Sequence, residues 1–290
     1  MIEDMKKILF FTLLCIATML SAQQPIELPL WPDGAPNSNG LTGSEENLEG
    51  GRMANVIHPN ITVYRAAKPN GMAILMCPGG GYARLALRHE GHDMAGWFNA
   101  QGITYVVMKY RMPNKHYEVP LSDAEQAIRL IRLHAVEWGV DPHRVGVMGA
   151  SAGGHLAASL STLYSSDETR PDFQILFYPV ISMEKEITHA GSRSFLLGDN
   201  PSEELVRHYT LQKQVNERTP QAFIMLSADD HTVVPANSIG YFQALCSHKV
   251  PVSMHIYPTG GHGWGFRDAF TYKRQWTGEL EKWLREGVVF

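Results

Sequence analysis

Ser151 is the residue of this sequence whose surroundings most clearly suggest chemistry. It lies in Gly149-Ala150-Ser151-Ala152-Gly153, directly after the apolar run 145–148 and before an alanine-rich stretch. A strand that ends in such a turn and continues as a helix forms a nucleophile elbow, in which the glycines permit a sharp turn that exposes the hydroxyl. The first turn of the helix then presents free N–H groups to the atom under attack. We therefore predict that Ser151 is a nucleophile.

A serine nucleophile needs a neighbouring base to take its proton, and histidine is the side chain suited to this near neutral pH. The predicted base is His262, which lies in a glycine-rich turn after the apolar run 252–257. The sequence holds 13 histidines, and three of them compete with His262. They are His89, His231, which could equally be solvated, and His255, which alternates within a strand and is expected to pack in the core.

The base in turn needs a carboxylate that holds the imidazole in one tautomer and stabilises it when charged. Two adjacent residues, Asp229 and Asp230, follow the apolar run 222–226. Asp230 can take this role, and Asp229 is the alternative. The aspartate that does not bind the histidine is expected to cap the following turn.

Alternating strands and helices must bring these residues together. Strands are predicted at 60–64, 72–77, 103–108, 145–148, 175–178, 222–226 and 252–257, and helices at 90–101, 122–138, 152–164, 235–248 and 272–284. This alternation predicts an α/β fold with a mainly parallel central sheet and helices on both faces. Ligands of such sheets bind at the carboxyl ends of the strands, which is where Ser151, Asp230 and His262 are predicted to lie.

Two local patterns refine this arrangement. Residues 26–51 are rich in Pro, Gly, Asn and Glu and are predicted to form an irregular surface arm. Ser122-Asp123-Ala124-Glu125 has the form of a capping box and predicts that a helix begins there.

The N-terminal segment and the composition of the chain indicate where the protein is found and which partners it has. Residues 1–22 combine early lysines, an apolar core at 8–20 and small residues at 21–22, which predicts a secretory signal peptide and a secreted or periplasmic protein. Residues 23–290 are predicted to form one domain. The net charge of −4 with interspersed signs does not suggest nucleic-acid or membrane-surface partners, and no Cys/His spacing suggests a metal site. Cys77 and Cys246 are expected to be unpaired buried thiols.

These motifs together resemble the acetyl esterase and acetylxylan-esterase-like branch of the α/β-hydrolase superfamily, related to hormone-sensitive lipase. The matching segments are 77–82, 109–111, 123–124, 138–142, the turn around Ser151, 229–238 and 261–263. They extend over nearly all of residues 55–285, and the order Ser, Asp, His is that of α/β-hydrolases. One departure is Pro78, which stands where many relatives have His before the glycines.

The resemblance assigns roles to further residues. It implies that the backbone amides of Gly80, Gly81 and Ala152 form an oxyanion hole, without fixing which two glycines of 79–81 point inward. Donors of this kind are each worth about 3–4 kcal/mol of transition-state stabilisation. It favours Asp230 as the acid because Val233 follows it by three residues, as in the family.

The remaining polar residues near the strand ends have open roles. Arg111, Trp264 and Tyr82 either line the pocket or serve ordinary packing, and His155 is expected to make structural hydrogen bonds from its helix.

The function that the resemblance implies is that of a serine esterase without a cofactor, which removes short acyl groups, above all acetyl, from carbohydrates such as xylan oligosaccharides. Feruloyl esterase, lipase and peptidase activities use the same machinery and are the alternatives. A non-catalytic binding protein of the same fold would be expected to lack part of the triad. Neither the oligomeric state nor the natural ester follows from the sequence.

Overall fold

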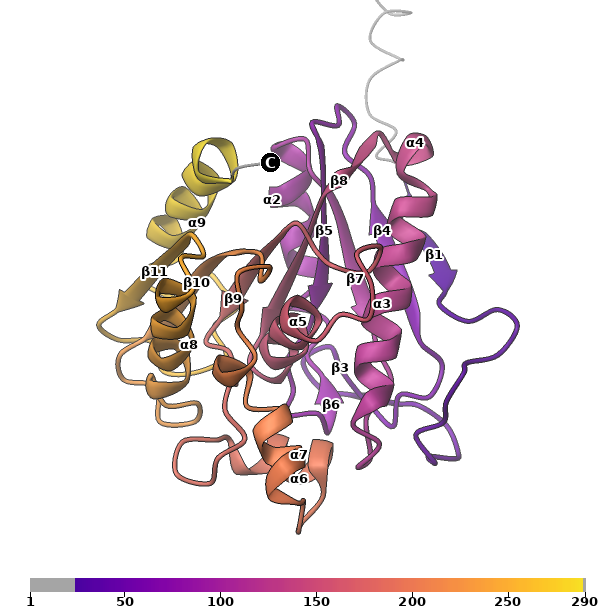
Figure 1. The fold of residues 1–290 in the computed structure, drawn as a ribbon. Coiled ribbons are helices and arrows are strands. Elements are labelled where there is room, and N and C mark those ends of the chain that lie inside the picture. The colour runs from indigo at the N-terminus through magenta and orange to yellow at the C-terminus, as the bar shows by residue number, and fades with distance from the viewer. Residues whose placement is uncertain (1–23, 289–290) are drawn as a thin grey trace, which may run out of the picture.

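The structure, a computed structural model, describes residues 24–288. The predicted signal peptide, residues 1–22, therefore lies outside the described residues. An eight-stranded sheet in the order β1-β4-β7-β5-β8-β9-β10-β11 crosses the molecule (Figure 1). Its strands are β1 (Ile26–Pro29), β4 (Asn60–Tyr64), β5 (Gly71–Cys77), β7 (Thr104–Lys109), β8 (Val140–Ala150), β9 (Phe173–Phe177), β10 (Gln221–Ser227) and β11 (Val252–Tyr257).

Six neighbouring strands, from β7 to β11 in the sheet order, pair in parallel. The central ones are buried on both faces, which is why their sequences are continuous apolar runs. At the other edge of this sheet, β4 pairs antiparallel with both β7 and β1. The predicted mainly parallel sheet is confirmed. All seven predicted strands are present: β4 and β11 have the predicted bounds, and the other five differ by up to five residues at their ends.

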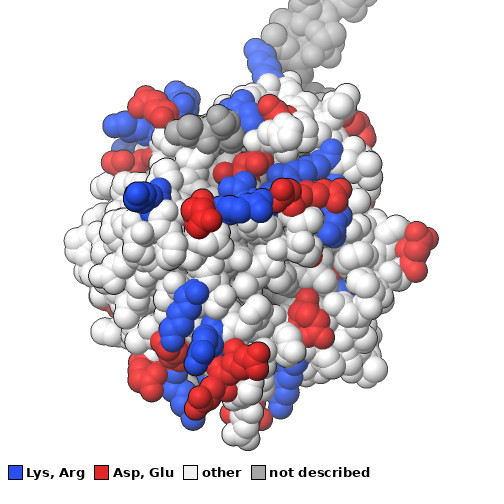
Figure 2. Space-filling view, viewed as in Figure 1, with Lys and Arg blue, Asp and Glu red and all other residues white. Residues whose placement is uncertain are grey.

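Helices cover both faces of the sheet, as predicted. The main ones are α2 (Ala95–Ala100), α3 (Glu118–Leu133), α4 (Ala135–Trp138), α5 (Ala152–Thr162), α6 (Ala190–Leu197), α7 (Glu203–His208), α8 (Ala236–Ser247) and α9 (Lys273–Lys282). One core lies under α3, α5 and α8, and a second lies under α2 and α9. On the face shown in Figure 2, charges of both signs are intermixed.

The prediction of an irregular arm at 26–51 is wrong in part. Residues 26–29 form β1, and β2 (Glu46–Leu48) joins β3 (Arg52–Ala54) and β6 (Arg84–Leu85) in a small antiparallel sheet. The partner of β1, β4, lies more than 30 residues further along the chain, and β2 pairs with β3 just beyond the arm, so the composition of the arm alone did not reveal either pairing.

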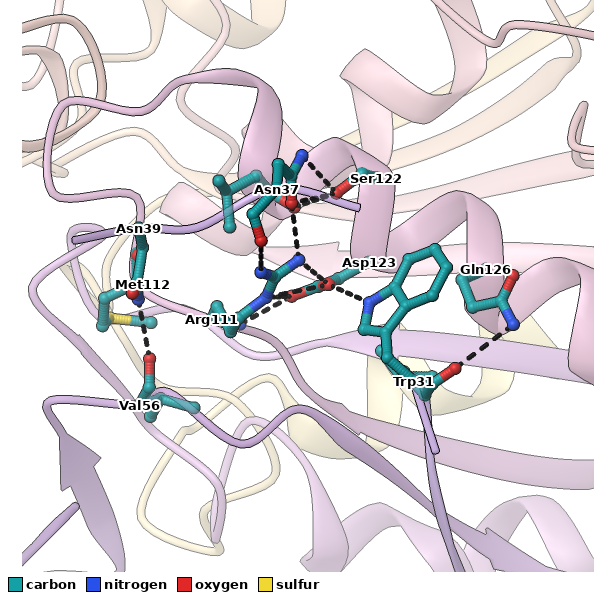
Figure 3. A network of polar contacts seen from close by, with 11 residues as sticks. Trp31, Asn37, Asn39, Val56, Arg111, Met112, Ser122, Asp123 and Gln126 are labelled. Carbon is teal, nitrogen blue, oxygen red and sulfur yellow. Dashed lines mark hydrogen bonds and ion pairs between the residues drawn. The ribbon is translucent and has the colours of Figure 1, made fainter. Parts of the chain in front are cut away.

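The capping-box prediction is also wrong, because α3 begins at Glu118 and Ser122 lies inside it. The Ser122 hydroxyl donates to the Val119 carbonyl at 2.8 Å. The Asp123 carboxylate is fully buried and pairs with Arg111 at 2.6 Å, and the Trp31 indole donates to it at 2.7 Å (Figure 3). Arg111 also donates to both oxygens of Asn37, so the pair ties the N-terminal arm to α3.

Three smaller expectations need correction. The helix predicted at 90–101 has its α-helical part only at α2, and Glu90 lies before it in a buried turn. The predictions place no helix between 178 and 222, where α6 and α7 form a layer beyond the strand ends. Cys77 and Cys246 are both unpaired, as expected, but only Cys77 is buried, because Cys246 lies on an exposed face of α8.

Within residues 24–288 no helix is long and apolar enough to cross a membrane.

Candidate active site

Ser151 lies between the end of β8 and the start of α5 with φ 56° and ψ −120°, a strained conformation for a residue with a side chain. Close backbone contacts explain the flanking glycines. A Cβ atom on Gly149 would lie 2.1 Å from the Gly153 carbonyl oxygen, and one on Gly153 would lie 2.1 Å from the Cys77 carbonyl oxygen. The predicted elbow is therefore formed, and β5, β8 and α5 meet too closely at it for any larger residue.

The three predicted triad side chains form one hydrogen-bonded chain. His262 Nε2 lies 2.8 Å from Ser151 Oγ, and His262 Nδ1 lies 2.6 Å from Asp230 Oδ2. Asp230 and Ser151 are 1% and 6% exposed. With Nδ1–H donating to the carboxylate, Nε2 is free to accept the serine proton, which is the arrangement that a general base requires.

The two adjacent aspartates have different partners. The second oxygen of Asp230 accepts from the backbone amides of Thr232 and Val233, both at 2.9 Å, so the carboxylate is fixed in place. Asp229 instead accepts from Gly261 at 2.8 Å and Gly260 at 3.2 Å, which lowers the pKa of its carboxyl. Asp229 thus holds the turn that carries His262, and Asp230 is the aspartate that contacts the imidazole.

The three predicted oxyanion donors lie around Ser151. Gly80 and Gly81 line the same cavity as Ser151, and in the described part of the chain their amides donate to no protein acceptor. The Gly79 amide is occupied, because it donates to Glu90 Oε2 at 3.1 Å. Ala152 is the first residue of α5, where amides have no intrahelical acceptor. The amides of Gly80, Gly81 and Ala152 are the donors that the resemblance implies, and their role as an oxyanion hole stays a prediction.

Glu90 is a residue of this site that the sequence analysis missed. Its carboxylate is 3% exposed, and Oε1 accepts from the Tyr178 hydroxyl at 2.8 Å. That hydroxyl accepts from the Gly265 amide at 2.8 Å, and the Tyr178 ring packs edge-on against His262 at 4.7 Å. Burial raises the pKa of Glu90. Through Gly79 and Tyr178 it connects the glycine loop to the His262 loop. Its sequence surroundings, Arg88-His89-Glu90-Gly91-His92-Asp93, are polar throughout and give no signal that Glu90 is buried.

The other predicted polar residues lie outside the reacting group. His155 is buried in α5 and bonds to Tyr82 and to the Tyr209 carbonyl, as expected for a structural histidine, and burial lowers its pKa to about 4. Tyr82 is therefore a packing residue, and Trp264 stacks on Phe270 at 4.1 Å.

The three competing histidines also have other environments. His231 is exposed, His255 stacks on Phe223, and His89 lies by Arg267.

A cavity of about 420 Å³ opens beside Ser151, a size typical of small-ligand sites. Its lining includes Gly80, Gly81 and His262 from the chemical group, and His189, Gly191 and Phe195 from the segment around α6. Phe195 is 48% exposed and forms an apolar wall. Residues 24–288 contain no cluster of three or more His, Cys, Asp or Glu side chains that could hold a metal.

Residues 74–266 match a family model described as an alpha/beta hydrolase fold. The chain is 41% identical to an acetylxylan esterase of Xylanibacter ruminicola over 221 residues, which are 75% of this chain and 46% of that protein. It is 35% identical to an endo-1,4-beta-xylanase B of Butyrivibrio fibrisolvens over 204 residues, 66% of this chain and 32% of that protein. The chain thus spans less than half the length of these relatives.

Among solved structures, the chain resembles an acetyl ester-xyloside bifunctional hydrolase from Caldicellulosiruptor lactoaceticus. The two share 35% identity with a TM-score of 0.78, over 93% of this chain and 100% of that one. A sugar hydrolase from Lactococcus lactis shares 28% identity with a TM-score of 0.68, over 85% of this chain and 98% of that one.

Proposed function

The chain belongs to the α/β-hydrolase fold family, and from that premise we propose that it is a serine esterase that removes acetyl and other short acyl groups from carbohydrates such as xylan oligosaccharides. The observation that carries the proposal is the continuous hydrogen-bonded chain from Ser151 through His262 to Asp230. The acetylxylan esterase and the acetyl ester-xyloside hydrolase among the relatives support the choice of substrate.

In the first half of the reaction Ser151 Oγ attacks the ester carbonyl carbon while His262 Nε2 takes the hydroxyl proton. The carbonyl oxygen becomes an oxyanion, and the amides of Gly80, Gly81 and Ala152 are the proposed donors to it. The C–O bond to the alcohol then breaks, and the alcohol leaves with the proton from His262. The acyl group remains as an ester on Ser151.

In the second half water attacks the acyl-serine, and His262 again takes and returns the proton. Asp230 keeps Nδ1 protonated throughout, because both of its oxygens are fixed by His262 and by two backbone amides. The protein groups supply nucleophile, base and oxyanion donors, so the proposal requires no metal or cofactor.

Replacement of Ser151 by Ala tests the proposal. The variant should fold normally and lose turnover of 4-nitrophenyl acetate, and a fluorophosphonate probe should label the wild type but not the variant. Ser247→Ala, which removes an exposed hydroxyl that contacts only the Ala244 carbonyl and the neighbouring His248 ring, is the matched control and should keep full activity. Retained turnover in Ser151→Ala would contradict the proposal, and an unlabelled wild type would favour a non-catalytic binding protein.

The acyl preference needs a panel of substrates. Acetylated xylan, cinnamoyl esters, long-chain esters and peptides should rank with acetylated xylan first. The ring of Phe195 offers an apolar surface of the kind a sugar face can contact. Faster turnover of cinnamoyl esters would support a feruloyl esterase, and faster turnover of long-chain esters or peptides would support a lipase or peptidase.

Export is a further part of the proposal. Residues 1–22 have the pattern of a signal peptide, and residues 23–290 are proposed as the mature single domain. Expression of the full chain in a bacterial host, followed by fractionation and intact mass measurement, should find a periplasmic protein shortened by about 22 residues. An uncleaved cytosolic protein would refute this.

A further inference from the structure

Three arginines surround the cavity beside Ser151. They come from separate elements: Arg52 from β3, Arg84 from β6 and Arg267 from the loop after His262. We call them the arginine cluster. Arg84 lies in the turn that follows the proposed oxyanion donors, since its amide donates to the Gly80 carbonyl at 3.3 Å. The β3–β6 pairing sets Arg84 opposite Ala54, two residues from Arg52. The fold therefore brings the three arginines to the lining of one cavity.

The charges of the cluster are not neutralised by the protein. Within residues 24–288 none of the three guanidinium groups forms an ion pair with a carboxylate. Asp268, which follows Arg267 in the chain, pairs with Lys273 at 2.7 Å instead. Unpaired arginines that line a cavity are available to an anionic ligand, with which guanidinium makes paired hydrogen bonds.

Other groups of the cavity do not cancel this charge. Glu90 is the one carboxylate in the lining, where it accepts from Gly79 and Tyr178. It also interacts electrostatically with Arg267, but a single carboxylate offsets at most one of the three positive charges. His89 is neutral near pH 7, because burial and the nearby Arg267 and Arg52 lower its pKa to about 4. Its ring nitrogen Nε2 therefore accepts from Arg267 at 3.2 Å and orients that guanidinium. The lining of the cavity thus carries a net positive charge.

We infer that this site prefers esters of carbohydrates that carry an anionic group, such as the carboxylate of a uronic acid, and that the arginine cluster binds that group. The inference rests on the proposed function and narrows its substrate class. The arginines act as specificity residues, because the anion lies on a part of the substrate away from the scissile bond while Ser151 attacks the ester.

A matched pair of acetyl esters tests the inference. The anion 4-acetoxybenzoate and its neutral methyl ester carry the same acyl group. The measured quantity is the ratio of kcat/KM for the anion to kcat/KM for the neutral ester. Comparing this ratio between wild type and variant cancels the different intrinsic reactivities of the two esters. Arg52→Gln, Arg84→Gln and Arg267→Gln should each lower the anionic-to-neutral ratio, by up to about fivefold for an exposed pair, and the triple variant should lower it further. Salt at 0.5 M should weaken the preference in the wild type.

Arg274→Gln is the matched control, because Arg274 is an exposed arginine on α9 that does not line the cavity, and it should leave the ratio unchanged. A ratio that stays constant in the triple variant would overturn the inference.

A binding measurement separates the inference from the proposed function. Calorimetry on Ser151→Ala should show tighter binding of a glucuronic-acid-bearing xylo-oligosaccharide than of its neutral counterpart, and the preference should disappear when the three arginines are also replaced. Equal binding of the two sugars would overturn the inference. If the wild type hydrolyses neither ester, the proposed function fails, while this binding experiment still decides the role of the arginines.

Discussion

Replacing each of the two adjacent aspartates by asparagine distinguishes their roles. In Asp230→Asn the side-chain oxygen can still accept from the amides of Thr232 and Val233, so the fold should be kept. The new NH₂ group then faces His262 Nδ1, which lies 2.6 Å from the carboxylate in the wild type. A donor at this position favours the tautomer with Nδ1 unprotonated, and Nε2–H can no longer accept the proton of Ser151.

The expected loss is about 10⁴-fold in kcat, the cost of the same change in serine-protease triads. Asp229→Asn should cost far less, because Asp229 contacts only the amides of Gly260 and Gly261, and an asparagine oxygen can accept from them. The assay is 4-nitrophenyl acetate hydrolysis, with Ser151→Ala as background and thermal unfolding as the check on folding. A larger loss in Asp229→Asn than in Asp230→Asn would refute the assignment.

Three further substitutions test the packing around the site. Gly153→Ala should lower the free energy of unfolding by roughly 1–3 kcal/mol or more, because its Cβ meets the Cys77 carbonyl, whereas Gly240→Ala, where a Cβ meets nothing within 4 Å, should not destabilise the protein. Glu90→Ala leaves the Gly79 amide and the Tyr178 hydroxyl without an acceptor, which should lower the free energy of unfolding by roughly 1–3 kcal/mol for each group and should also lower kcat. Glu90→Gln keeps an oxygen acceptor, so the loss of unfolding free energy measured by chemical denaturation should be smaller. His155→Gln should weaken the pH dependence of stability. The pKa of His155 is lowered to about 4 in the folded protein, so acid favours the unfolded chain, which binds the proton more tightly. Between pH 6.5 and pH 4 the unfolding free energy of the wild type should therefore fall by about 3 kcal/mol more than that of the variant.

Each of these three predictions has a result that counts against it. A fully stable Gly153→Ala would mean that β5 and α5 can move apart. Unchanged kcat and stability in Glu90→Ala would mean that the two loops hold their positions without the carboxylate. Stability–pH curves of the same slope for wild type and His155→Gln would mean that His155 titrates alike in the folded and unfolded chain, and exposed His231→Gln serves as the control.

Most of the regular fold follows from local sequence patterns. Buried parallel strands such as β5 and β10 have to be apolar throughout, so each is visible as a continuous run. The elements that were predicted wrongly depend on distant partners. β1 forms because β4 offers it an edge. The predicted capping box does not form, because Ser122 donates to Val119 within α3 and the Glu125 carboxylate accepts from the distant Ser165 and Thr169.

The sequence by itself determined the chemistry that could be performed, because the glycines around Ser151 and the order of Ser151, Asp230 and His262 are local or linear properties of the chain. Tertiary structure decided which of two adjacent aspartates faces the imidazole, since their side chains diverge and only the position of His262 distinguishes them. It also decided the surroundings of the site: Glu90 lies between two loops, and three arginines from separate elements meet at one cavity. These side chains come from elements far apart in the sequence and meet only through long-range packing, so no local sequence pattern predicts that they lie together.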